Sequence, residues 1–139
     1  SLFNISFGKS ITDIGGWAFR YCTSLTSITI PESVTSIEGS LFSGCTSLEE
    51  IVIPNSVTSI GSSAFENTPW YNQQPDGVVY VNDVLYKYKG EMPVYTSIKI
   101  KEGTICISPH AFSGCSNLMR IAIPNSVTSI GRGAFSLCI

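Results

Sequence analysis

The sequence predicts a repeat solenoid, a fold in which successive coils of chain stack on one another and share one core. Two observations carry this prediction. The stretch Ile51 to Phe65, IVIPNSVTSIGSSAF, returns as IAIPNSVTSIGRGAF at residues 121–135 and as ITIPESVTSIEGSLF at residues 28–42. Each copy also has a single row of apolar residues, which it cannot bury alone but can bury against the next copy. The recurring stretch is therefore a unit of stacking.

The full unit reads L-x-x-I-x-I-P-x-S-V-T-S-I-G-x-x-A-F-x-x-C-x-x. Its phenylalanine stands at Phe19, Phe42, Phe65, Phe112 and Phe135, so the steps are 23, 23, 47 and 23 residues. We expect one domain over residues 1–139, with repeats near residues 5–27, 28–50, 51–68, 95–120 and 121–139. Both ends fall inside a repeat, so we expect the chain to be part of a longer protein.

Each part of the unit predicts a structural element. The I-x-I segment predicts a short strand whose alternate residues enter the core. These apolar pairs are Ile5 and Phe7, Ile28 and Ile30, Ile51 and Ile53, Ile98 and Ile100, and Ile121 and Ile123. The following proline ends the strand because it has no amide hydrogen to donate. S-V-T-S-I predicts a second extended edge, and G-x-x-A-F is long enough for about one helical turn.

The unit resembles the BspA-like class of leucine-rich repeats, whose 23-residue units occur in surface proteins of bacteria and some protozoa. The resemblance covers the whole chain except residues 69–94. It implies a right-handed α/β-type solenoid with a parallel β-sheet on one face and short helical turns on the other.

Residues 69–94 interrupt the repeat as an insertion that contains neither A-F nor S-I-G, and Tyr95 then stands in the leucine position. The middle of the insertion, VVYV-ND-VLYKY at residues 78–88, predicts a β-hairpin with an Asn82-Asp83 turn. In that register Val79, Val81, Val84 and Tyr86 share one face, which we expect to pack against other residues. A degenerate coil is the alternative, because the excess of 24 residues is close to one repeat.

Composition and charge exclude several classes of protein. Hydrophobic residues make up 43% of the chain and charged residues 13%, which excludes a disordered tail. The net charge is −2 and no basic run occurs, so we expect no nucleic-acid partner. No apolar run approaches the ~18 residues of a membrane span. We expect that the opening residues, SLFNISFGKS, are not a signal peptide.

Residues that could carry chemistry are few. Cys22, Cys45, Cys115 and Cys138 share one repeat position, and no C-x-x-C pair occurs, so we expect no metal site. Small buried thiols are the preferred interpretation, with disulfides between neighbouring coils as the alternative. His110 is the only histidine and stands in a variable position, which indicates the surface. We therefore expect no catalytic residue, no cofactor and no enzymatic activity.

Two surfaces are candidates for binding other proteins. The outward positions of the predicted sheet form a strip of small and charged residues that includes Thr29, Val52, Lys99 and Ala122. The insertion and its flank are rich in aromatic residues, namely Trp70, Tyr71, Tyr80, Tyr86 and Tyr88. Such residues are enriched at binding hot spots, but a hairpin also needs aromatic side chains to attach it to a solenoid. Both interpretations stay open at this point.

The resemblance implies a non-enzymatic protein-recognition or adhesion module of a secreted or cell-surface protein. Its partners would be proteins such as host extracellular matrix or cell-surface components. A passive structural spacer within a larger surface protein is the alternative. Uncapped coils, with apolar rows at Phe7 and Phe135, also predict end-to-end self-association.

Overall fold

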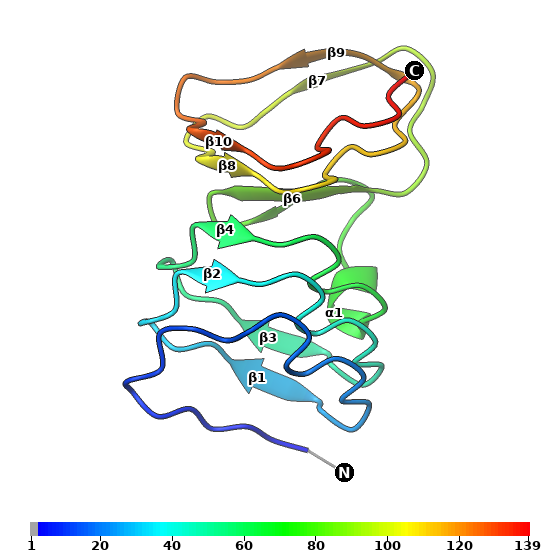
Figure 1. Cartoon of the computed structure of the whole chain (residues 1–139). Helices are drawn as coiled ribbons and strands as arrows, with labels where there is room; N and C mark the ends of the chain where they lie inside the picture. The colour runs from blue at the N-terminus through cyan, green and yellow to red at the C-terminus, as the bar shows by residue number, and fades with distance from the viewer. Residues whose placement is uncertain (1–2) are drawn as a thin grey trace. The chain divides into compact units, whose positions relative to one another are not determined.

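The computed structural model describes residues 3–139 and divides the chain into two compact units, Ser1–Gln74 (unit 1) and Pro75–Ile139 (unit 2). Each unit is a β-solenoid in which short strands of successive coils lie beside one another and are joined by turns (Figure 1).

Unit 1 contains two parallel strand pairs. β1 (Ser27–Thr29) pairs with β3 (Glu50–Val52), and β2 (Ser36–Ile37) pairs with β4 (Ser59–Ile60). Each residue faces the residue 23 positions later, for example Ile28 and Ile51. The 23-residue repeat length therefore sets the register in which neighbouring coils pair. The strands predicted from I-x-I and from S-V-T-S-I are confirmed in these coils.

The phenylalanine position forms a ladder of rings in the core of unit 1. Phe19 and Phe42 stack with ring centroids 5.8 Å apart, and Phe42 and Phe65 stack at 6.1 Å. Phe42 and Phe65 are fully buried, as are Leu25 and Leu48 in the leucine position. Because each ring contacts the same position of the next coil, burial depends on the stack rather than on one coil.

Helical turns were predicted opposite the sheet, and they are not confirmed, because each coil has two residues with left-handed backbone there. The first position holds Trp17, Ser40, Ser63, His110 and Gly133, with φ between 56° and 63°. The second position holds Tyr21, Gly44, Asn67, Gly114 and Leu137, with φ between 58° and 78°. Left-handed residues cannot continue a right-handed helix. These segments therefore form hydrogen-bonded turns.

Helix α1 (Pro69–Asn72) is the one helix in the described part of the chain. Thr68 caps it, since its hydroxyl accepts a hydrogen bond from the Tyr71 amide at 3.1 Å, and Pro69 suits the first turn. The Trp70 ring lies 4.6 Å from the Phe65 ring, and the Trp70 amide donates to the Leu48 carbonyl. Helix α1 therefore packs against the last coil of unit 1.

Unit 2 begins with a β-hairpin. β5 (Gly77–Val81) pairs antiparallel with β6 (Val84–Lys89) through a turn at Asn82-Asp83, as predicted. A bulge between Val79 and Tyr80 shifts the pairing, so that Val79 faces Lys87 and Tyr86 is the extra residue. The four residues predicted to share a packed face, Val79, Val81, Val84 and Tyr86, are all buried.

The remaining strands of unit 2 continue the repeat. β8 (Cys106–Ile107) lies between β6 and β10 (Ser129–Ile130), with parallel pairing on both sides. β7 (Thr96–Lys99) pairs in parallel with β9 (Leu118–Ala122). The second strand of the hairpin thus joins the row of second strands, in the place where a coil would contribute its own.

The hydrogen bonds of β6 are those of a coil. The Ser108 amide donates to the Leu85 carbonyl, as the Gly131 amide donates to the Ile107 carbonyl one coil later. The Tyr88 amide donates to the Ala111 carbonyl at 2.8 Å. In the regular coils the phenylalanine amide makes this bond to the residue in the alanine position of the next coil, for example Phe42 to Ala64. Tyr88 therefore occupies a phenylalanine position, and its ring lies 6.3 Å from that of Phe112.

The leucine position of the same irregular coil differs from the prediction. Tyr95 was expected there, but its side chain is 78% exposed and its φ is 62°. Met92 enters the core cluster instead, together with Leu85 and Ile100. Asn117 fixes this arrangement by donating its side-chain amide to the Met92 carbonyl at 2.8 Å. A flexible thioether fills an irregular gap more easily than a phenol, whose hydroxyl would need a buried partner.

Candidate protein-contact surfaces

The sheet face of unit 1 consists of the outward side chains of β1 and β3, which are Ser27, Thr29, Glu50 and Val52. Thr29 pairs with Val52 in the register, and both side chains are exposed. Between them the inward residues Ile28 and Ile51 are buried. The outward residues are therefore exposed and can contact a partner.

The sheet face of unit 2 consists of the outward side chains of β7 and β9, which are Ser97, Lys99, Arg120 and Ala122. Lys99 pairs with Ala122, and both are exposed. A register shift lets Thr96 face Leu118 and Ser97 face Arg120, so Met119 is the extra residue of a bulge. Met119 is 70% exposed at the edge of this face.

The structure brings the four predicted sheet residues together in two pairs, Thr29 with Val52 and Lys99 with Ala122, one pair on each unit.

The tyrosines of the hairpin are buried or half-buried in unit 2. Tyr86 is 3% exposed. Tyr80 is half-buried against the core of unit 2, and its hydroxyl accepts a hydrogen bond from the Lys101 amide at 3.0 Å. Tyr88 is also half-buried, in the phenylalanine position described above. This burial favours the structural interpretation of the aromatic insertion.

Trp70 and Tyr71 lie on helix α1 of unit 1 and are half-buried. The contact of the Trp70 ring with Phe65 gives it a core role. The aromatic residues of the insertion therefore fall into two groups, one in each unit.

Exposed aromatic residues occur elsewhere. In unit 2, Tyr95 and Val94 line a small cavity with Met119 at the start of β7 and β9. In unit 1, Trp17 and Tyr21 are 66% and 62% exposed, and the Arg20 guanidinium lies 4.7 Å from the Tyr21 ring centre. Sequence reasoning did not single out Trp17, Tyr21, Val94 or Met119 as contact residues, and it placed Tyr95 in the leucine position. The signal for Trp17 and Tyr21 was an aromatic side chain in two variable positions, which hold serine, histidine or glycine and glycine, asparagine or leucine in the other regular coils.

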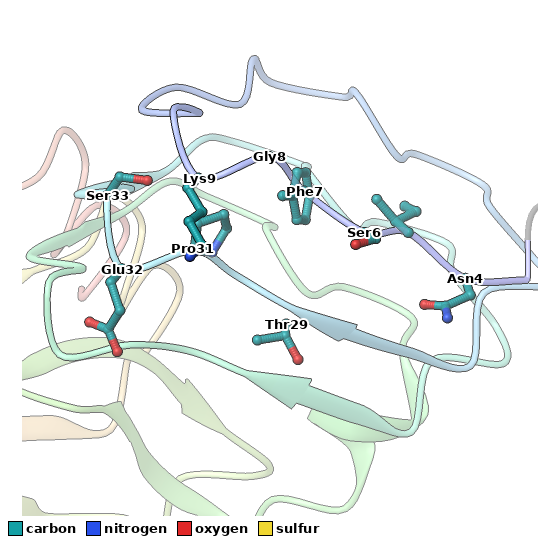
Figure 2. Close-up of a pocket in the computed structure, with 10 residues that line it drawn as sticks. Asn4, Ser6, Phe7, Gly8, Lys9, Thr29, Pro31, Glu32 and Ser33 are labelled. Carbon is teal, nitrogen blue, oxygen red and sulfur yellow. The ribbon is translucent and has the colours of Figure 1, made fainter.

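A cavity of about 780 Å³ lies in unit 1 beside Thr29. Figure 2 shows residues 4–9 along one side of it and Thr29, Pro31, Glu32 and Ser33 along the other. A strand was predicted at Ile5 and Phe7, but none forms, and no backbone hydrogen bond joins residues 3–9 to β1. Ile5 and Phe7 are nevertheless half-buried, since the Phe7 ring lies 6.0 Å from that of Phe19.

The five cysteines are free thiols with buried or half-buried side chains. The Cys45 thiol donates to the Phe19 carbonyl and the Cys138 thiol to the Phe112 carbonyl, both at 3.0 Å. Burial raises the pKa of Cys45 to about 11 and also raises the pKa of Cys106 and Cys115. These thiols therefore stay protonated at neutral pH, which makes them poor nucleophiles and poor metal ligands.

His110 is exposed and has a left-handed backbone, and its ring lies over Gly133 of the next coil. Over residues 3–139, no three His, Cys, Asp or Glu side chains come together as a metal site. Within the same range, none of the helical structure has the length and apolar character needed to cross a bilayer.

Comparison with known proteins agrees with this architecture. The model of the BspA type leucine-rich repeat region matches residues 1–74 and 85–139 in six copies. A search of curated proteins finds no match.

Three crystal structures are similar to the chain. A leucine-rich repeat protein from Bacteroides ovatus is 30% identical with a TM-score of 0.53, over 99% of this chain and 29% of that one. A leucine-rich repeat protein from T. pallidum is 28% identical with a TM-score of 0.49, over 92% and 49%. A leucine-rich cell surface protein from Faecalibacterium prausnitzii is 26% identical with a TM-score of 0.41, over 90% and 48%.

The chain thus spans less than half the length of each of these proteins. The 23-residue register, the phenylalanine ladder and the matched repeats together lead to one conclusion: the chain belongs to the BspA type leucine-rich repeat family.

Proposed function

We propose that this chain is a non-enzymatic protein-recognition module of a longer secreted or cell-surface protein. Its partners would be other proteins, such as host extracellular matrix or cell-surface components. Family membership supports this proposal, because leucine-rich repeats typically serve as protein-interaction modules.

One observation carries the placement of the contact on the sheet faces. On each face the inward residues are the ones that pack, while the outward residues Thr29, Val52, Lys99 and Ala122 are exposed. Parallel strands held at about 4.8 Å from their neighbours give these side chains a rigid spacing, so little entropy is lost on binding. The insertion aromatics Trp70, Tyr71, Tyr80, Tyr86 and Tyr88 support the scaffold in this proposal.

The experiment measures binding of the chain to a panel of purified extracellular matrix proteins by biolayer interferometry. Thr29→Arg and Ala122→Arg place bulk on the two sheet faces without entering the core. We expect at least one matrix protein to bind, and at least one of these variants to weaken binding about tenfold or more.

Ser59→Arg is the control, because Ser59 is an exposed residue of β4 outside both sheet faces. It should bind as the unmodified chain does. A chain that binds nothing above background is the result expected of a passive spacer. Binding that survives both sheet-face substitutions would place the contact elsewhere.

A further inference from the structure

The two sheet faces carry opposite charge. On unit 1, Glu50 points outward from β3, and the neighbouring Glu49 is also exposed. On unit 2, the outward charged residues are Lys99 of β7 and Arg120 of β9. None of these four side chains forms an ion pair with another described residue of the chain. Each face therefore presents unpaired charge of one sign.

The charge of each whole unit has the same sign as its face. Unit 1 contains two cationic side chains and six carboxylates, whereas unit 2 contains six cationic side chains and four carboxylates. An asymmetry of this kind steers oppositely charged surfaces toward each other over a Debye length of about 10 Å at 0.1 M salt.

Shape and apolar surface on the two faces are also compatible. Most other outward residues are small, namely Ser27, Thr29, Ser97 and Ala122. Small side chains allow two sheets to approach to the usual ~10 Å. Each face has exposed apolar surface as well, from Val52 on unit 1 and from Met119 on unit 2.

We propose that the sheet face of unit 1 in one copy of this chain docks on the sheet face of unit 2 in a second copy. Glu49 and Glu50 then lie against Lys99 and Arg120, with Val52 and Met119 supplying apolar contact. This inference rests on the proposed function, in which these faces are contact surfaces. The partner is a second copy because the basic sheet face of unit 2 is complementary to an acidic surface with small outward side chains and some apolar area. The sheet face of unit 1 has these properties.

Sedimentation velocity over a range of protein concentrations tests this contact. At about 20 mM salt the chain should associate reversibly, and at about 500 mM salt the association should weaken about tenfold or more, since exposed ion pairs are screened. Association that does not respond to salt would overturn the proposal and would fit apolar contact between coil ends instead.

Two double variants make the test specific. Glu49→Lys with Glu50→Lys makes both faces basic, and Lys99→Glu with Arg120→Glu makes both faces acidic. Each double variant alone should be monomeric at low salt, and an equimolar mixture should associate. Failure of the mixture to associate would overturn the proposal.

A matched control has the same change in net charge outside the sheet faces. Glu38→Lys with Glu66→Lys, both at exposed positions of unit 1, should still associate at low salt, because the charges on the sheet faces are unchanged. A monomer under all conditions would overturn self-docking while leaving matrix binding, measured separately, as the test of the proposed function.

Discussion

Unit 1 and unit 2 build the same kind of core from unequal sequences. In unit 1 the leucine and phenylalanine positions are filled by Leu48 and Phe65, each fully buried. In the first coil of unit 2, Met92 and Tyr88 fill the corresponding core positions, and the Tyr95 side chain is exposed. The comparison shows that the backbone bonds between coils are preserved where the side-chain pattern is lost. The irregular segment therefore contributes Met92 and Tyr88 to the core of unit 2.

The largest effect should come from the regular ladder. Phe65→Ala should lower the free energy of unfolding by about 3–5 kcal/mol, because a fully buried ring between Phe42 and Trp70 is lost. Tyr88→Ala should cost only about 2 kcal/mol, since that side chain is half-buried. Urea unfolding of both variants measures the difference. Equal losses would show that Tyr88 is as central to its unit as Phe65 is to unit 1.

The next largest effect on stability concerns Met92, which lies in the core where Tyr95 was expected. Met92→Ala should cost about 2–4 kcal/mol in urea unfolding, because its side chain is 7% exposed within the core cluster. Tyr95→Asn should be neutral or stabilising by up to about 1 kcal/mol, since asparagine tolerates the left-handed backbone better than tyrosine does. A large loss of stability in Tyr95→Asn, with a small loss in Met92→Ala, would show that Tyr95 and not Met92 packs in the core.

The left-handed turn positions should respond in opposite directions. Gly44→Ala should cost about 1–2 kcal/mol, because φ is 76° there and the added Cβ would overlap the Tyr21 ring. Trp17→Gly should stabilise by about 1 kcal/mol, since Trp17 is strained and two-thirds exposed. Thermal unfolding of both variants tests this. A destabilising Trp17→Gly would mean that the indole ring contributes more through packing than it costs in strain.

The smallest effect is a pH dependence. The pKa of Cys45 is raised in the folded state from 9.0 to about 11, so the folded chain holds this proton more tightly than the unfolded chain. Stability should therefore fall as pH rises from about 9 to about 11. Melting temperatures of the unmodified chain and Cys45→Ala across this range isolate the thiol. Parallel pH profiles would contradict the assignment.

The strands and the register could be predicted from the sequence because both follow from repetition. A 23-residue period places Ile28 beside Ile51, and the structure has this pair. The hairpin turn at Asn82-Asp83 could also be predicted, since it depends on local chemistry. The helical turns could not, because backbone handedness at Trp17 and Tyr21 is imposed by stacking and contradicts the preference of those residues.

The candidate site was predictable only in part. Alternation along each strand identified Thr29, Val52, Lys99 and Ala122 as outward, and all four are exposed. The bulge that exposes Met119 and the reversal of Tyr95 arise from the fit of an irregular segment into a regular stack. No periodicity in the sequence encodes that fit.

The central claim is that the insertion completes a coil while the sheet faces contact partners. It is tested most directly by measuring matrix-protein binding and urea unfolding together for Ala122→Arg and Tyr88→Ser. We expect Ala122→Arg to weaken binding about tenfold with unchanged stability. Tyr88→Ser should lose about 2 kcal/mol of stability and keep its binding. Normal binding by Ala122→Arg, with a binding defect but full stability in Tyr88→Ser, would contradict the account.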